Sequence, residues 1–329
     1  MVISKTPLRA SLFGGGTDFK GYWKSSKMGY GTVISAALDM HVYITVNRKF
    51  DDMIRVVYSG NELVSSVDEV KHNIIREALK ITGISKGIEV IYMADIPLSG
   101  AGVGLASSSA LAVGVLNALH AYKGEYVTPD ILAREACEIE IDRLGQQIGI
   151  QDQYAVAYGG LHQYRFYPNE KVSVNPIIGC SETLKKLEDN LLMFYTGQTR
   201  DSRKILKEQT DTLVDKTAML DELVGITDRI YSEAFREDRL DMIGERLDYA
   251  WAIKKKFASG VSNELIDAMY QKAKEAGALG GKVLGAGGGG FLLFYVPGDK
   301  QEAVRTALSD FREVDFRIDS QGSNIIFSD

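Results

Sequence analysis

The chain has 329 residues, enough for two domains of ordinary size with a substantial core. Hydrophobic residues make up 45% of it and charged residues 25%, the usual balance of a soluble globular protein. The net charge of −6 disfavours nucleic acid or an anionic membrane as a general partner, because binding to either requires basic surface.

The cysteines, Cys137 and Cys180, lie far apart and lack C-x-x-C spacing, so they predict neither a disulfide framework nor a zinc site. The first residues show no basic segment followed by an apolar run. No stretch approaches the ~20 uninterrupted apolar residues that a membrane span requires. We therefore expect a cytoplasmic protein without a membrane partner.

The first part of the chain alternates between predicted strands and helices. Apolar, β-branched stretches at 42–46 and 88–92 predict strands, and residues 69–82 have helical periodicity. Residues 107–122 are rich in Ala and Leu and predict a buried helix.

Another helix and a strand pair follow. Thr128 and Pro129 predict a helix start, with threonine as the N-cap and proline in the first turn. This helix is expected to reach about Gln147. A strand pair is predicted across residues 160–178, with a Pro-Asn turn in its middle.

The pattern changes near Ser181. Residues 200–277 are almost entirely helical in pattern. The sequence then predicts a strand at 291–296, a helix near 299–312 and short strands near 314–318 and 323–327. This order indicates an α+β second domain with helices on one face of a small sheet. We expect an N-terminal domain at 1–180 and a C-terminal domain at 181–329.

The segment from Pro97 to Ala110 carries the strongest chemical signal. Its glycines let backbone N–H groups approach an anion, and the helix that follows adds unpaired donors and a positive dipole end. Ser107, Ser108 and Ser109 offer hydroxyls to phosphate oxygens or a metal ion. A plain glycine turn before a serine-capped helix is the alternative. The order strand, glycine loop, serines and apolar helix favours phosphate binding.

The run from Gly285 to Gly290 satisfies the dinucleotide pattern G-x-G-x-x-G, but its context argues against that function. A predicted strand follows it, whereas the fingerprint should open a helix early in a βαβ unit. The chain also contains no Walker A pattern. A glycine-rich bend where two backbones pack closely remains an open interpretation of this run.

Phosphoryl transfer needs an oriented hydroxyl, a neutralising cation and usually Mg²⁺. Asp152 stands between two glutamines and before an apolar stretch, which predicts a semi-buried carboxylate at a helix start. Arg9 lies in a largely apolar segment and is expected to be paired. For Arg9, a structural ion pair and a functional role stay equally open. Glu140 lies on the preceding helix, where carboxylates are more often solvated.

Together these segments resemble the GHMP kinase superfamily, which includes galactokinases, homoserine kinases and mevalonate kinases. Its three motifs occur in order, at Pro7–Asp18, Pro97–Ala110 and Lys282–Phe291, so the resemblance covers nearly the whole chain. Each motif alone is a weak signal and the ordered trio is a strong one. The resemblance implies an α+β fold of two domains, the first like a ribosomal-protein module and the second ferredoxin-like, with the site between them.

The resemblance also implies roles for single residues. The second motif would wrap the phosphates of ATP, through Gly100, Ala101, Gly102, Gly104, Ala106, Ser107, Ser108 and Ser109. Ser109 and Glu140 would ligate Mg²⁺. Asp152 would orient or deprotonate the sugar hydroxyl, and Arg9 would lower the hydroxyl's pKa or stabilise transferred charge. Substrate contacts are implied for Gly15, Gly16, Thr17, Asp18, Asp152, Gly287 and Gly288.

The first motif departs from the galactokinases, which carry a Glu-His pair where Gly15 and Gly16 stand here. The form from Phe13 to Asp18 is similar to the branch of D-glycero-D-manno-heptose 7-phosphate kinases, with fucokinase-type enzymes as more distant relatives. That branch phosphorylates the anomeric hydroxyl, giving the 1,7-bisphosphate in nucleotide-activated heptose synthesis for surface polysaccharide. Missing side chains beside the sugar would make room for a larger, phosphorylated substrate.

A phosphorylated substrate requires local cations. Tyr195–Lys204 follows a predicted strand and opens a long helix, and it combines hydroxyls with Arg200 and a second arginine. Its composition alone leaves a capped helix with solvated charges equally open. In the heptose kinase branch a Thr-Gly-x-x-Arg stretch recurs here, which implies that Arg200 holds the substrate phosphate, with Lys204 as a weaker candidate.

Three alternatives stay open. Another sugar kinase of the same superfamily would act on a fucose-like or galactose-like substrate. A non-catalytic sensor would bind ATP and sugar without transfer, but the intact set of Arg9, Ser109, Glu140 and Asp152 favours catalysis. A Rossmann dehydrogenase is a weak competitor. The expected ligands are ATP, Mg²⁺ and a sugar phosphate, with no nucleic acid, and a homodimer is compatible with the sequence.

Overall fold

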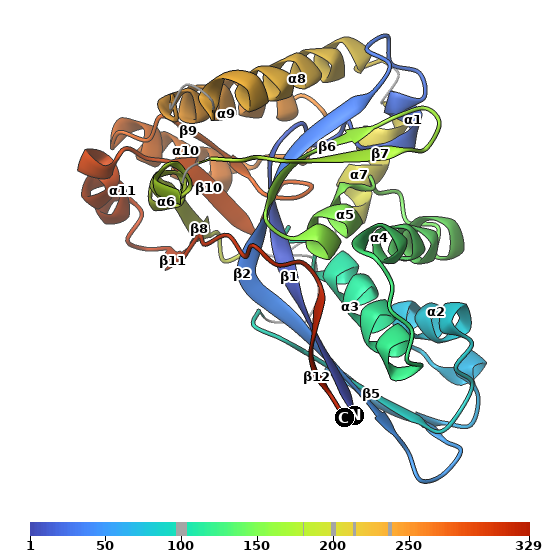
Figure 1. The fold of residues 1–329 in the computed structure, drawn as a ribbon. Coiled ribbons are helices and arrows are strands. Elements are labelled where there is room, and N and C mark those ends of the chain that lie inside the picture. The colour runs from blue at the N-terminus through green and yellow to red at the C-terminus, as the bar shows by residue number, and fades with distance from the viewer. Residues whose placement is uncertain (97–103, 180, 199–201, 213–214, 236–238) are drawn as a thin grey trace.

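The computed structural model describes residues 1–96, 104–179, 181–198, 202–212, 215–235 and 239–329. Among these residues, two sheets and their helices form two adjoining bodies (Figure 1). None of the described helices combines the length and the apolar character needed to cross a membrane.

The first sheet contains eight strands among the described residues, in the path β12-β1-β2-β5-β3-β4 with β6 and β7 branching from β2. Their bounds are Val2–Phe13 (β1), Gly31–Arg48 (β2), Ile54–Val57 (β3), Asn61–Val64 (β4), Ile88–Ala94 (β5), Leu161–Phe166 (β6), Val172–Pro176 (β7) and Asn324–Ser328 (β12). The predicted strands at 42–46 and 88–92 and the predicted pair at 160–178 are all present. The unusually long β2 pairs with β1 along its length and then holds β5 at one end and β6 at the other.

Helices of the first body cover one face of this sheet (Figure 1). Their bounds are Lys20–Trp23 (α1), Asn73–Thr82 (α2), Ser107–Tyr122 (α3), Pro129–Cys137 (α4) and Gln151–Tyr158 (α5). Helix α3 contacts β1, β2 and β12 on one side and α2, α4 and α5 on the other. All its residues from Ser109 to His120 are buried, as expected of a helix that is apolar on all sides. The start of α3 therefore stands on a rigid support.

The helix predicted from Thr128 to about Gln147 is only partly regular. The predicted cap is confirmed, because the Thr128 hydroxyl accepts a hydrogen bond from Ile131 N at 3.4 Å. After Cys137 the chain continues as a π-helical turn at Glu138–Arg143, a form that occurs often at functional sites. The wider turn lets Glu140 point inward, where its side chain is fully buried.

The second sheet has the order β11-β8-β10-β9 with all neighbours antiparallel. Its strands are Leu191–Tyr195 (β8), Gly280–Val283 (β9), Phe291–Tyr295 (β10) and Arg312–Val314 (β11). In chain order this is fourth, first, third, second, the arrangement of the ferredoxin-like fold that the resemblance implies. The helices are Ser181–Asp189 (α6), Ser202–Asp211 (α7), Thr217–Arg229 (α8), Asp241–Lys254 (α9), Glu264–Glu275 (α10) and Gln301–Ala307 (α11).

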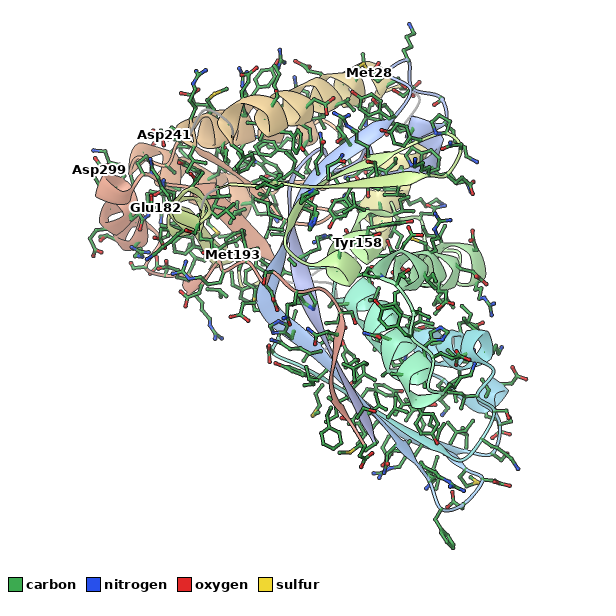
Figure 2. The ribbon with its side chains drawn as sticks, viewed as in Figure 1. Met28, Tyr158, Glu182, Met193, Asp241 and Asp299 are labelled. Carbon is green, nitrogen blue, oxygen red and sulfur yellow. The ribbon has the colours of Figure 1, made fainter. Side chains whose placement is uncertain are left out.

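Helices cover both faces of the second sheet, so the expectation of helices on one face is wrong. Side chains of β8 alternate between two cores: Leu192 packs with α10 and α11, whereas Met193 joins the core shared with the first body. Met193, labelled in Figure 2, is completely buried. On this inner face α9 lies close to β9, where a Cβ on Gly280 would come within 2.1 Å of the Gly244 carbonyl oxygen. The long helical insertion between β8 and β9 provides this second cover.

The last strand belongs to the first sheet, not to the second as the sequence analysis expects. After β11 the chain turns back, and Leu38 and Ile318 form an isolated bridge. Strand β12 then pairs antiparallel with β1, from Val2 opposite Ser328 onward. The pairing satisfies backbone groups of β1 that would otherwise form an open sheet edge. It also brings the two termini together (Figure 1).

Candidate active site

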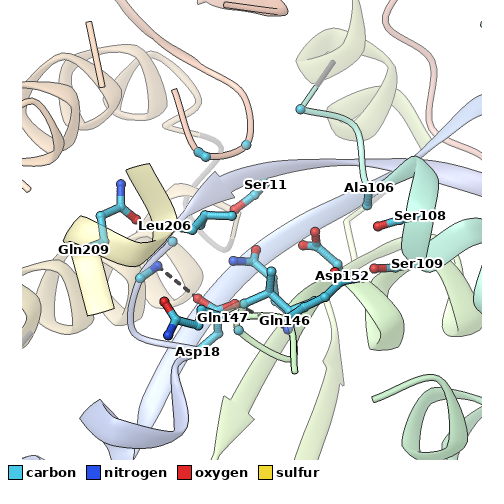
Figure 3. Close-up of a pocket in the computed structure, with 18 of the residues that line it drawn as sticks. Ser11, Asp18, Ala106, Ser108, Ser109, Gln146, Gln147, Asp152, Leu206 and Gln209 are labelled. Atoms are coloured by element: carbon cyan, nitrogen blue, oxygen red, sulfur yellow. Dashed lines mark hydrogen bonds between the residues drawn. The ribbon is translucent and has the colours of Figure 1, made fainter. Parts of the chain in front are cut away.

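A pocket with a volume of about 630 Å³ lies where the three glycine-rich segments meet (Figure 3). One wall holds the start of α3 and the carboxylate of Asp152, and α7 faces it with Leu206 and Gln209. The walls also include the end of β1, residues 144–149, the end of α9 and residues 284–287. Both bodies of the molecule therefore contribute to the pocket, as the resemblance implies.

Two of the glycine segments touch backbone to backbone. A Cβ on Gly104 would lie 2.4 Å from the Leu284 carbonyl oxygen, and one on Gly285 would lie 2.5 Å from the Gly104 Cα. Both residues have positive φ, at 85° and 73°. Close backbone packing, the open interpretation of the Gly285 run, is therefore correct for Gly285. It brings the third motif against the end of the second.

The start of α3 presents its serines to the pocket. Ser107, Ser108 and Ser109 line it, together with Gly104 and Ala106. Ala106 is held at φ 60° and ψ 36°, a left-handed conformation that is costly for a residue other than glycine and is typical of functional sites. The unpaired N–H groups and positive dipole end of α3 suit an anion. Gly100, Ala101 and Gly102, predicted to bind the same phosphates, lie outside the described residues.

Arg9 and Asp152 form the ion pair at the centre of the site. Arg9 Nε donates to Asp152 Oδ1 at 2.8 Å, and Nη2 donates to Oδ2 at 2.6 Å. A third bond runs from Arg9 Nη1 to the Gly104 carbonyl oxygen at 2.7 Å. The arginine side chain is 5% exposed and the aspartate 25%, so both line the pocket but the carboxylate is the more accessible of the two. Arg9 is thus both an ion-pair partner and part of the site.

Glu140 is a completely buried carboxylate beside the serines. Its Oε2 accepts from the Ser109 hydroxyl at 2.7 Å and from Gln153 Nε2 at 2.6 Å. Burial raises the pKa of Glu140, and the hydrogen bonds from the serines and the glutamine oppose that rise. Its Oε1 is buried without a hydrogen-bond partner among the described residues. An orphaned carboxylate oxygen next to a hydroxyl is a donor set that suits Mg²⁺.

Some residues of the first motif line the pocket, and another stabilises the turn behind the pocket wall. Gly15, Gly16 and Asp18 line the pocket. Asp18 is 3% exposed and accepts from Gly16 N at 2.9 Å; burial, followed by the charge of Asp152, raises its pKa. Thr17 is buried outside the walls, and its hydroxyl donates to the carbonyl oxygens of Gly14 and Thr32 at 2.9 and 2.8 Å. This geometry gives Thr17 a turn-stabilising part, and its substrate contact stays a prediction.

The other predicted substrate residues are also separated by the structure. Gly287 lines the pocket. Gly288 lies outside the walls, and its N–H donates to the Val261 carbonyl oxygen at 2.7 Å. Arg200 is outside the described residues, and Lys204 is exposed away from the pocket, whereas Lys207 on the same helix lines it.

Lys254 and three polar side chains of the pocket escaped the sequence analysis. Lys254 is 8% exposed, and its Nζ donates to the Gly285 carbonyl oxygen at 2.6 Å. Ser11 Oγ, Gln151 Oε1 and Gln209 Nε2 are buried without hydrogen-bond partners among the described residues. Nothing in the run of three lysines from 254 to 256 marks the first of them as the inward one. Gln151 and Gln153 flank Asp152 in the sequence, and that pattern predicts a role for the aspartate alone.

Comparison with known proteins agrees with this geometry. The family model of the GHMP kinases N terminal domain matches residues 68–160, and that of the GHMP kinases C terminal region matches residues 231–313. The chain is 30% identical over 326 residues to the D-glycero-alpha-D-manno-heptose 7-phosphate kinase of Campylobacter jejuni, covering 93% of each chain. It is 26% identical over 339 residues to the bifunctional fucokinase/GDP-fucose pyrophosphorylase of Arabidopsis thaliana, covering 95% of this chain and 31% of that protein.

Among solved structures, a D-glycero-D-manno-heptose 1-phosphate kinase from Bacteroides thetaiotaomicron has the same fold, with a TM-score of 0.81 at 24% identity over 100% of both chains. The family models together cover more than half of this chain, in the order of its two bodies. The ferredoxin-like second sheet and the meeting of the three motifs at one pocket agree with that match. The chain belongs to the GHMP kinase family, in the part of it that holds the sugar kinases.

Proposed function

We propose that this kinase transfers the γ-phosphoryl group of ATP to the anomeric hydroxyl of D-glycero-D-manno-heptose 7-phosphate, giving the 1,7-bisphosphate. The observation that carries the proposal is the pair of Arg9 and Asp152, which lines the same pocket as the serines of α3. The relative in Campylobacter jejuni, named a heptose 7-phosphate kinase, favours this substrate over other sugars. ATP as the donor agrees with a cytoplasmic enzyme.

The donor end of the pocket is the start of α3. The N–H groups of its first turn and the serine hydroxyls suit the phosphates of ATP. Ser109 and Glu140 would hold Mg²⁺, which supplies a positive charge against the phosphate oxygens when bound. The rigid burial of α3 keeps these groups in place while the substrate changes.

In the transfer step Asp152 acts as the general base. The sugar oxygen forms a bond to the γ-phosphorus, the bond from that phosphorus to the β,γ-bridging oxygen breaks, and ADP leaves with its electron pair. The proton of the attacking hydroxyl passes to Asp152, whose side chain is exposed to the pocket. Arg9 orients this carboxylate by its two parallel bonds and holds it against Gly104 at the end of the phosphate loop.

The acceptor end suits a ligand with many hydroxyl groups. Ser11 Oγ, Gln151 Oε1 and Gln209 Nε2 offer one acceptor or donor each to such a ligand, and buried polar groups of this kind normally find partners. At Gly15 an added Cβ would lie 3.6 Å from Ser11 Oγ, an ordinary van der Waals distance. The backbone there would accept a Cβ, so the missing side chain, which a galactokinase would carry, leaves room in the pocket and supports a sugar larger than galactose.

A coupled ADP-release assay over a panel of sugars tests the substrate. The panel contains the heptose 7-phosphate, the unphosphorylated heptose, L-fucose and D-galactose. We expect the highest kcat/KM for the heptose 7-phosphate. Clear turnover of a free sugar together with no turnover of the heptose phosphate would reject the assignment and favour the fucose-like or galactose-like alternative. Absence of turnover with every sugar, despite ATP binding, would favour the sensor.

A further inference from the structure

The side chain of Lys254 enters the pocket from the second body. It is the last residue of α9 and the one member of its lysine run that is buried, at 8% exposure, whereas Lys255 and Lys256 are exposed. Its Nζ lies within 2.6 Å of the Gly285 carbonyl oxygen and 4.0 Å from the position of a Cβ on Gly15. Gly285 in turn packs on Gly104. The ammonium therefore lies between Gly15 of the first motif and Gly285, which packs on Gly104 at the end of the second motif.

The charged groups around Lys254 come from several elements. Arg9 of β1, Asp18 after β1, Asp152 of α5 and Lys282 of β9 all act on it electrostatically. Lys282 has its own partners, because its Nζ donates to the carbonyl oxygens of Ser11 and Leu12 at 2.6 and 3.1 Å. It is 5% exposed and does not line the described pocket. Lys282 thus anchors β1 to β9, whereas Lys254 lines the pocket.

Among the described residues that line the pocket, Lys254 is the buried cation whose ammonium has donors to spare. Arg9 is matched by Asp152 through two bonds and is tied to Gly104 by a third. The hydrogen bond recorded for Lys254 among the described residues goes to a neutral carbonyl, and an ammonium has three donors. A buried cation without a matched carboxylate is costly for folding, and an anion at the site offsets that cost.

We infer that Lys254 is a catalytic residue whose ammonium contacts the phosphoryl group as it passes from ATP to the sugar hydroxyl. This inference rests on the proposed phosphoryl transfer but not on the identity of the sugar. Lys254 stays protonated throughout and donates hydrogen bonds to the equatorial phosphoryl oxygens, where charge is spread in the transition state. Asp152 alone accepts the proton of the hydroxyl.

The dependence of kcat/KM on pH provides a test of the role of Lys254. Burial, reinforced by the charge of Arg9, lowers the pKa of Lys254 to about 8, while Asp18 and Asp152 oppose the shift. The ammonium is present below that pH and is lost as the pH rises through it. We therefore expect kcat/KM of the wild type, which reports the free enzyme, to fall above about pH 8. Arginine keeps its charge, so Lys254→Arg should lack this upper limb.

The central comparison is between Lys254→Met and Lys256→Met, which removes the same charge from an exposed neighbour. With the sugar that the wild type turns over best, Lys254→Met should lose about 100-fold or more in kcat, as for a lost transition-state donor, with KM values within about 3-fold. Lys256→Met should retain wild-type kinetics. A rise in KM with unchanged kcat, or normal kcat, would overturn the inference.

A second measurement needs no sugar. Binding of ADP with Mg²⁺ is compared by calorimetry with and without aluminium fluoride, which imitates the phosphoryl group in transfer. We expect aluminium fluoride to tighten ADP binding to the wild type and to Lys256→Met but not to Lys254→Met, with ADP alone bound equally by all three. An equal gain in Lys254→Met, or no gain in any form, counts against the inference. Turnover of a sugar other than heptose 7-phosphate rejects only the substrate assignment.

Discussion

Asp152 keeps a quarter of its side chain accessible, at 25%, although Arg9 occupies both of its oxygens. The sequence predicts each member of this pair from its local surroundings, since an arginine in an apolar segment and a carboxylate at a helix start both require an explanation. Their bond joins residues separated by 143 positions, which no local pattern encodes. Lys254 escapes the same reasoning because the phase of α9, and not its composition, turns it inward while Lys255 and Lys256 face solvent.

Asp152→Asn is the variant that most directly tests the proposed base. The amide has the same shape but accepts no proton, so turnover should fall about 100-fold or more while ATP affinity stays within a factor of about 3. Steady-state kinetics and ATP titration measure the two effects. Asp310→Asn, at an exposed position far along the chain, is the control and should behave as wild type. Near-normal turnover of Asp152→Asn would remove Asp152 from the mechanism.

A prediction about stability concerns His120 on α3. Its ring bonds Glu135 at 2.9 Å and Glu125 at 2.8 Å, and these bonds, that to Glu135 first, raise its pKa. A raised folded-state pKa means that the charged ring stabilises the fold fully below the ordinary value of 6.5. This contribution disappears as the pH rises through the raised value. Urea unfolding should therefore show that His120→Gln loses about 1–2 kcal/mol more at pH 6 than at pH 9. An equal loss at both pH values would contradict this.

At the scale of elements, propensity and periodicity predict most of the parts. The buried helix at 107–122 has the predicted bounds, and the Thr128 cap begins α4 as expected. The π-helical turn at Glu138–Arg143 is not predictable in this way, because it depends on the buried hydrogen bond that Glu140 accepts from Ser109 of another helix. The backbone contact between Gly104 and Gly285 also depends on two elements from different bodies, although glycine in both runs indicates that close approach is required.

Gly285→Ala tests whether this contact serves the donor site. Gly124 offers a matched control, since its φ of 77° is close to the 73° of Gly285 but nothing lies within 4 Å of an added Cβ. Gly124→Ala should therefore show only the backbone cost of about 1–2 kcal/mol in urea unfolding. Gly285→Ala should cost more and weaken ATP binding about 10-fold, because it pushes the third motif away from the phosphate loop. Equal behaviour of the two variants would show that the contact has no part in binding.

For the whole molecule, the resemblance implies the two-domain architecture and the position of the site between the bodies. The strand order β11-β8-β10-β9 confirms the ferredoxin-like part. The return of β12 to the first sheet is not predictable from the sequence, because a short apolar strand carries no signal of its partner. The domain boundary between residues 180 and 181 remains a prediction. Strand β12 follows this boundary in the sequence but pairs with β1 of the first sheet. The second cover of the β8–β11 sheet by α9 comes from an insertion whose helices are predictable and whose docking face is not.

The position of phosphorylation tests the central claim most directly. The purified enzyme is incubated with ATP, Mg²⁺ and D-glycero-D-manno-heptose 7-phosphate, and the product is examined by phosphorus NMR. The account predicts a second phosphomonoester signal, coupled to the anomeric proton, beside the unchanged signal of the 7-phosphate. A reaction that leaves the single 7-phosphate signal unaccompanied, or that adds phosphate at a carbon other than the anomeric one, would contradict it.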